Sequence, residues 1–69
     1  MYIINNLDRR PIQKYKAEIK FATGENKEFN DVIECIVDER IYRITTIDNN
    51  IYTIPIDRVI SVNFIKQPL

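Results

Sequence analysis

The chain has 69 residues, and ten basic residues balance ten acidic ones, so its formal net charge is zero. A globally basic nucleic-acid-binding protein is therefore excluded, although a local basic patch is not. Isoleucine occurs 14 times, whereas alanine and leucine occur twice each and glycine once. This composition favours strands over a helical bundle, because branched side chains suit a pleated sheet. The length predicts one small domain over residues 1–69, with a lead-in segment at 1–12 and a β-barrel core at 13–66.

The lead-in begins with an apolar stretch. Tyr2, Ile3 and Ile4 predict a short strand, and a helical turn over residues 5–10 is the alternative. Regular structure is expected to break at Arg10, because the residue before a proline disfavours the helical region. We expect three apolar residues of this segment to cover part of the core: Ile4, Leu7 and Ile12.

Residues 14–22 alternate between apolar and charged side chains, which is the period of a half-buried strand. The apolar face consists of Tyr15, Ala17, Ile19 and Phe21, and the charged face of Lys14, Lys16, Glu18 and Lys20. A turn is expected at residues 23–26, where Gly24 can adopt a positive φ.

Residues 29–38 fit two structures. Asp31 and Glu34 have the spacing of a helical capping box, and the apolar residues around them also fit a helical stripe. The run from Val32 to Val37 consists mainly of strand-forming residues, so we favour a strand and keep the helix as the alternative. A strand here would end in a tight turn at residues 38–40.

Residues 41–47 and 51–56 predict a β-hairpin with a three-residue loop at 48–50. The register that follows has these pairs: Ile47–Ile51, Thr46–Tyr52, Thr45–Thr53, Ile44–Ile54 and Tyr42–Ile56. A two-residue loop would mix the two faces of the hairpin. We therefore expect the three-residue loop, with Asn50 in the left-handed conformation.

Pro55 lacks a donor for the ladder, which places its strand at a sheet edge or ends it there. The chain is expected to turn at residues 56–58, and a last strand follows at 59–65. Five short strands joined by tight turns predict an all-β fold, a meander that curls into a small barrel. SH3-like and Sm-like barrels share this size and strand count. This resemblance concerns the fold alone and implies no function. The expected core is Tyr15, Ala17, Ile19, Phe21, Ile33, Cys35, Val37, Tyr42, Ile44, Ile54, Ile56, Ile60, Val62 and Phe64.

Little in the sequence supports catalysis. The chain has no histidine, so it lacks the usual general base near neutral pH, and one glycine cannot build a phosphate-binding loop. Cys35, the only cysteine, is expected to be a buried structural thiol. We therefore expect no enzyme activity, metal, cofactor or small-molecule substrate. The free thiol, the lack of a signal peptide and the lack of a membrane-spanning segment indicate the cytoplasm.

Charge is distributed unevenly along the chain. Basic residues dominate the segment 9–20, which carries Arg9, Arg10, Lys14, Lys16 and Lys20 against Glu18. One interpretation is a stripe that contacts phosphates, with Tyr2 stacked on a base, in a small nucleic-acid-binding β-barrel. A solvated strand face, whose lysines discourage edge pairing, explains the same residues and is the interpretation that we favour.

The sequence has more apolar residues than one core needs. Ile47 and Ile51 are expected to be neighbours flanked by Thr45 and Thr53, and a contiguous apolar patch of this kind marks a contact surface. Cover by the N-terminal segment is the alternative. The sequence therefore predicts a non-enzymatic interaction domain that binds a protein partner or a second copy through this strand surface. A regulator or inhibitor of a larger enzyme would suit this description. The composition is rich in isoleucine, asparagine and lysine and poor in alanine and glycine, as AT-rich coding produces, so we expect a bacterial or phage accessory protein.

Overall fold

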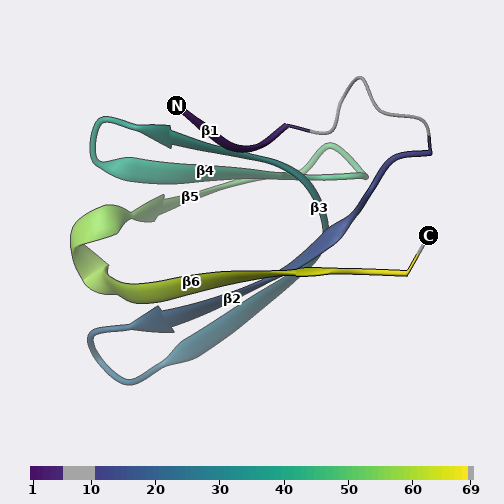
Figure 1. Ribbon diagram of the computed structural model, residues 1–69. Helices are drawn as coiled ribbons and strands as arrows, with labels where there is room; N and C mark the ends of the chain where they lie inside the picture. Colours follow the sequence, from purple (N-terminus) through teal and green to yellow (C-terminus); the bar gives the residue numbers. More distant parts are fainter. Residues whose placement is uncertain (6–10, 69) are drawn as a thin grey trace.

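The computed structural model describes residues 1–5 and 11–68, and it is built from one antiparallel six-stranded sheet (Figure 1). The elements are β1 (Tyr2–Asn5), β2 (Tyr15–Phe21), β3 (Asn26–Asp38), β4 (Ile41–Thr46), β5 (Ile51–Pro55), the 3₁₀ turn η1 (Ile56–Arg58) and β6 (Val59–Lys66). The strand order is β5-β4-β3-β2-β6, and β1 pairs with β3. Within the described residues β5 and β6 do not pair with each other, so the sheet is not closed into a barrel.

The predicted strands at 2–4, 14–22 and 29–38 are confirmed, and the helix alternative over 29–38 is wrong. The simple meander holds only from β2 to β5. At its end β6 returns to pair with β2, placing Phe64 opposite Ala17 and Val62 opposite Ile19. This return lets the apolar residues of β6 pack against the inner face of β2. The alternative helical turn over residues 5–10 lies almost entirely outside the described residues.

Strand β3 is long because it serves two parts of the sheet. Its first half pairs with β2, and its second half pairs with β1 and β4. Asp31 lies between the halves with φ at 60°, and its N–H donates to Gln67 Oε1 at 2.7 Å. Gln67 Nε2 in turn donates to Asp31 Oδ1 at 3.0 Å. At this kink the β2–β3 hairpin comes over the β4–β5 hairpin, where the Phe29 and Tyr52 rings lie 4.7 Å apart.

The core takes its buried residues from β1 to β5, and β6 adds partly buried ones. Its buried members are Ile4, Ala17, Ile19, Val32, Cys35, Ile44 and Ile54, and packed around them are Tyr15, Phe21, Phe29, Tyr42, Val59, Val62 and Phe64. The expected role of Ile4 is therefore confirmed, whereas Leu7 lies outside the described residues. Ile33 is also buried, and two further members of the expected core, Val37 and Ile56, are only half-buried.

Two irregularities in strand pairing overturn single core assignments. The register shifts between Lys20 and Phe21, so Val59 packs on the core and Ile60 is 62% exposed, not buried as predicted. A second shift in β3 buries Val32, which strict alternation had placed outside. A β-bulge changes which face the following side chains occupy, and simple period-two counting carries no information about it.

The β4–β5 hairpin has a register that differs by two residues from the predicted one. Thr45 lies opposite Ile51, and the Thr46 N–H donates to the Asn50 carbonyl at 3.0 Å. The loop therefore has three residues, as predicted, but they are 47–49, and the left-handed residue is Asn49 (φ 67°), not Asn50. The predicted faces of the hairpin are still correct, because a register shift of two residues leaves each side chain on the same face of the sheet.

Side-chain hydrogen bonds explain why the loop starts one residue earlier than predicted. The Thr46 hydroxyl donates to the Asp48 carboxylate, and Asn50 Nδ2 donates to the other Asp48 oxygen at 2.8 Å. The Ile47 N–H also donates to the Asp31 carbonyl at 2.9 Å. These contacts fix Asp48 in the middle of the turn.

Candidate protein-interaction edge

Strand β5 forms one end of the sheet, as Pro55 predicted, and one of its edges has no strand partner among the described residues. Backbone hydrogen bonds at both ends define which groups face β4: Thr46 N–H to the Asn50 carbonyl, and Ile56 N–H to the Arg40 carbonyl at 2.8 Å. Bonded and non-bonded pairs alternate along an antiparallel ladder. Ile51 and Thr53 therefore direct their backbone N–H and C=O groups away from β4, toward the free edge. Pro55 also faces away from β4, and it has no N–H that would need a partner at the free edge.

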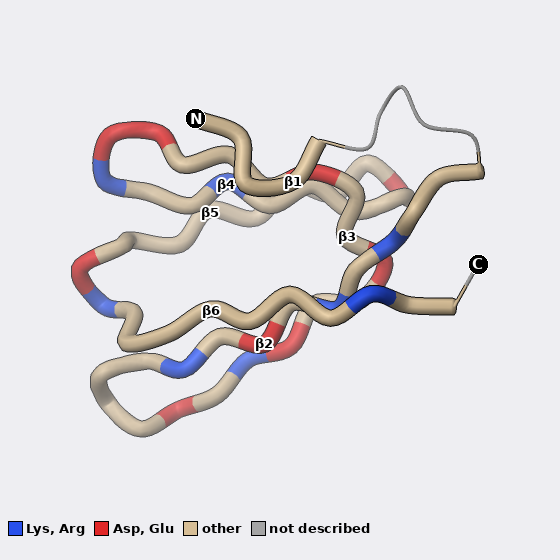
Figure 2. The backbone as a smooth tube through the Cα atoms, in the orientation of Figure 1, with Lys and Arg blue, Asp and Glu red and all other residues tan. Residues whose placement is uncertain are grey.

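The free edge of β5 carries no charge. Residues 49–56, between Asp48 and Asp57, contain no aspartate, glutamate, lysine or arginine, and Figure 2 shows β5 as an uncharged part of the backbone. Ile51 is 62% exposed. Natural proteins usually protect a free strand edge with charges, so an uncharged edge with exposed apolar side chains is suited to pairing with another strand.

The four residues predicted to bind a partner lie in this region but not in the predicted arrangement. Thr45 lies opposite Ile51, and Thr53 lies opposite Arg43. Ile47 is in the loop, 42% exposed, so the predicted cross-strand pair of Ile47 with Ile51 is wrong. Both isoleucines nevertheless remain exposed, which leaves apolar surface at the edge and at its loop.

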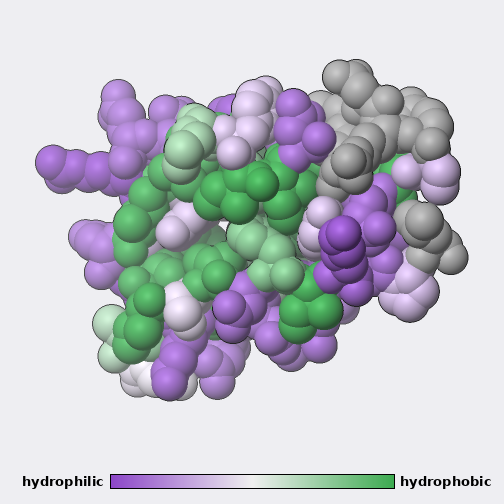
Figure 3. Space-filling view, viewed as in Figure 1, coloured by the Kyte–Doolittle hydropathy of each residue, from purple (hydrophilic) through white to green (hydrophobic). Residues whose placement is uncertain are grey.

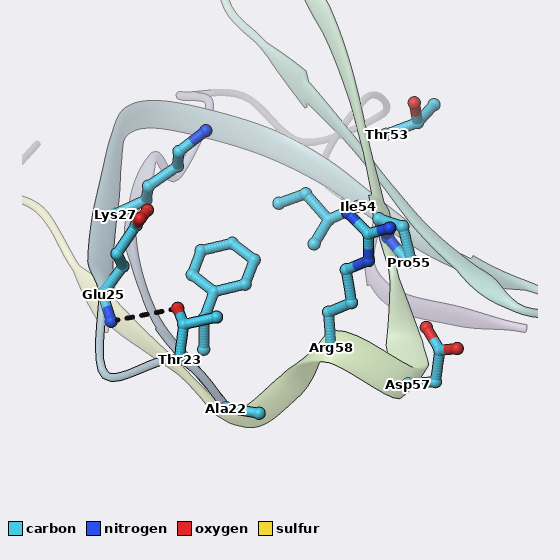
Figure 4. A pocket seen from close by; sticks show the side chains of 10 residues that line it. Ala22, Thr23, Glu25, Lys27, Thr53, Ile54, Pro55, Asp57 and Arg58 are labelled. Carbon is cyan, nitrogen blue, oxygen red and sulfur yellow. Dashed lines mark hydrogen bonds between the residues drawn. The ribbon is translucent and has the colours of Figure 1, made fainter.

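A cavity of about 490 Å³ opens beside the end of β5 (Figure 4). Phe21, Ile54 and Pro55 supply apolar lining. In Figure 4 the Ile54 side chain points into the cavity and the Thr53 side chain points away from it, although Thr53 is also a lining residue. The unpaired edge of β5 and the cavity are therefore parts of one surface.

Two cations extend over this apolar lining. Lys27 Nζ lies 6.0 Å from the centroid of the Phe21 ring, and Arg58 reaches from η1 toward Ile54 and Pro55. Among the described residues neither cation forms an ion pair. Glu25 and Asp57 also line the cavity, but Asp57 points away from it in Figure 4. The cavity thus combines an apolar floor with two cations that form no ion pair among the described residues, and Glu25 adds a carboxylate to its rim.

Sequence reasoning missed this cavity. Its walls come from the β2–β3 turn and from the end of β5 with η1, segments that are far apart in the chain. A backbone hydrogen bond from the Ala22 N–H to the Arg58 carbonyl, 2.9 Å long, ties the two together. No local pattern predicts such a juxtaposition.

The predicted basic stripe is partly neutralised. Lys16 Nζ lies 3.4 Å from Glu28 and 3.8 Å from Glu18, and Lys14 Nζ lies 3.8 Å from Asp31. Lys20 is exposed and has no ion pair within the part of the chain described. Arg9 and Arg10 lie outside the described residues.

Cys35 is fully buried in the core and not in a cleft. Burial raises the pKa of its thiol to about 11, with a smaller contribution from the charge of Glu34. A thiol of this kind is protonated at neutral pH and is a poor nucleophile. In residues 1–5 and 11–68, no group of three or more acidic, cysteine or histidine side chains could hold a metal ion.

Further large hydrophobic side chains are exposed at β1 and β6: Met1, Tyr2, Ile3, Ile60 and Ile65. Figure 3 shows hydrophobic side chains gathered across the face on which these two strands lie. No helix of the described residues is long and apolar enough to cross a membrane.

Comparison of the chain with protein-family models, with curated proteins and with solved structures yields no match.

Proposed function

We propose that this protein is a non-enzymatic interaction domain that binds protein by accepting an added strand at the free edge of β5. The observation that carries the proposal is the pair of outward backbone positions, Ile51 and Thr53, on an edge without charge. In strand addition the main-chain hydrogen bonds supply affinity, and the side chains on either face supply specificity. The exposed side chain of Ile51 and the adjacent cavity provide such side-chain contacts.

One further unpaired edge, along the first half of β3, is protected by charge. Among the described residues the first half of β3 pairs with β2 on one side only, and two of its first three residues, Lys27 and Glu28, are charged. Lys and Glu at an edge oppose the approach of another strand. The contrast favours β5 over the first half of β3 as the edge used for binding.

We also propose that the sheet is an open relative of the SH3-like and Sm-like barrels. The two end strands of the sheet, β5 and β6, follow each other in the chain and are joined only by η1. The kink at Asp31 curls the sheet between these ends. A cytoplasmic location remains a proposal supported by the single free cysteine.

Nucleic-acid binding by Lys14, Lys16 and Lys20 is less well supported. Each phosphate contact requires a cation that is free to leave its present partner, and two of these three lysines already face carboxylates. We therefore treat phosphate binding as an outcome of the test and not as a second proposal.

The experiment compares material captured from a bacterial lysate by the tagged chain, by Thr53→Pro and by a triple variant in which Lys14, Lys16 and Lys20 become Gln. Thr53→Pro removes an outward N–H and leaves the ladder with β4 intact, so the fold should survive. A specific protein retained by the native chain and the triple variant, but lost by Thr53→Pro, is the expected result. Retention of nucleic acid that a few hundred millimolar salt releases, and that only the triple variant loses, would contradict the proposal.

A further inference from the structure

The free edge of β5 is complementary to itself. When two copies of β5 meet antiparallel about a two-fold axis at Tyr52, Ile51 of each copy lies opposite Thr53 of the other. Every outward N–H and C=O of these residues is then paired, in four hydrogen bonds across the interface.

The two neighbouring registers of the β5–β5 pairing leave some outward backbone groups without a partner. A shift of β5 in one direction places Ile51 opposite Pro55, which has no N–H to donate. A shift in the other direction places Thr53 opposite Asn49, whose N–H already donates to the Thr46 carbonyl at 2.9 Å. The register centred on Tyr52 therefore uses the free backbone groups most completely.

The same register brings a loop to the cavity. Asn49 of the second copy lies opposite Pro55, so Asp48 and Ile47 of that copy continue past the end of β5, where the cavity opens. Ile47 is exposed and offers an apolar side chain to the floor formed by Phe21 and Ile54. Asp48 offers a carboxylate where Arg58 has no ion pair among the described residues.

The charges of the chain favour this pairing. Asp48 accepts hydrogen bonds from Thr46 and Asn50, and the first of these is the main reason that its carboxyl pKa lies below the usual value. It is therefore ionised at neutral pH and keeps lone pairs for a further donor. Because the chain has no net charge, two copies approach without long-range repulsion.

We propose that the chain forms a two-fold dimer through β5, in which Ile47 and Asp48 of each copy dock in the cavity of the other. This inference rests on the proposed function and adds the identity of the partner. It assigns the cavity, with Arg58, as a binding site for an apolar residue followed by a carboxylate.

Sedimentation of the full chain over a wide concentration range tests the dimer. Dimer formation is expected for the native chain, and Thr53→Pro should weaken it at least about tenfold, because two interface hydrogen bonds lose their donors. Arg58→Glu and Asp48→Lys should each weaken the dimer by about tenfold or more, because each places two like charges at the contact between residue 58 of one copy and residue 48 of the other. Lys20→Glu, the same type of charge reversal at an exposed lysine of β2, should have no effect.

Mixing the two charge-reversed variants gives the sharpest result. The mixed dimer holds one native Arg58–Asp48 contact and one reversed contact, so Arg58→Glu and Asp48→Lys should associate with each other and not with themselves. Circular dichroism of each variant alone checks its fold. Asp48→Asn, whose amide oxygen can still accept from the Thr46 hydroxyl, should weaken the dimer in the same direction.

The possible failures are distinguishable. A dimer broken by Thr53→Pro but indifferent to the charge variants would overturn docking in the cavity and leave strand addition standing. A chain that stays monomeric at every concentration would overturn the dimer, and the lysate experiment then decides the proposed function. A dimer that Thr53→Pro leaves intact would overturn the β5 interface itself.

Discussion

The hairpins β2–β3 and β4–β5 have similar inner faces, but their outer surfaces differ in charge. In β2–β3 the inner face includes Ile19, and in β4–β5 it includes Ile44; both side chains are fully buried. Outside, β2–β3 is covered by charges, including Lys16 between Glu18 and Glu28. Strand β5 has none, and its exposed edge presents Ile51. The fold needs the inner faces, and we infer that the difference between the edges reflects function.

The largest expected effect is common to both hairpins. Ile19→Ala and Ile44→Ala should each lower the free energy of unfolding by about 2–5 kcal/mol, because each leaves a cavity in the core. Urea denaturation followed by circular dichroism measures this loss. If one substitution were nearly neutral, the hairpins would not share one core.

Ile51→Lys makes the edge of β5 resemble that of β3. The exposed position should tolerate the change within about 0.5 kcal/mol of unfolding free energy, whereas strand addition should weaken about tenfold. Denaturation and sedimentation on the same samples separate the two effects. Glu28→Lys, on the protected edge, is the matched control and should not change association.

Cys35 links stability to alkaline pH. Its folded-state pKa is raised to about 11 from 9.0, so the contribution of the buried neutral thiol is complete below about pH 9. It is lost as pH rises from there through 11, because the unfolded chain releases the proton more easily. Denaturation midpoints should fall over this range, and Cys35→Ala should remove that part of the slope. An unchanged slope in the variant would show that the thiol is not the group responsible.

The smallest effect is expected on the charged face of β2–β3. Glu28→Gln breaks the 3.4 Å ion pair with Lys16, which is exposed to solvent and screened by salt. The free energy of unfolding should fall by less than about 1 kcal/mol, and less still in high salt. A loss of several kcal/mol would mean that this face contributes to the fold as strongly as the core does.

Much of the fold follows from local pattern. Period-two alternation located β2, glycine located the turn after it, and Pro55 ended the edge strand, because each of these signals is contained in a few neighbouring residues. The hairpin register was missed by two residues because Asp48 bonds to both Thr46 and Asn50. Bulges also escaped prediction, and one of them exposes Ile60.

The candidate site was predicted only in part. Ile51 and Thr53 were singled out from composition and alternation, and the structure places both on the free edge of β5. Phe21, Lys27 and Arg58 were not, because they meet only after β6 returns to β2 and the hairpins close over each other. Long-range pairing of this kind leaves no signal in a single sequence.

Residue-resolved amide hydrogen exchange tests the central claim most directly. In dilute protein, the amides of Ile51 and Thr53 should exchange rapidly, whereas those of Tyr52 and Ile54, bonded to β4, should be protected. Raising the protein concentration should protect Ile51 and Thr53 and leave Lys20 and Glu28 unchanged. Amides at Ile51 and Thr53 that exchange equally fast at all concentrations and with any captured partner would contradict strand addition at β5.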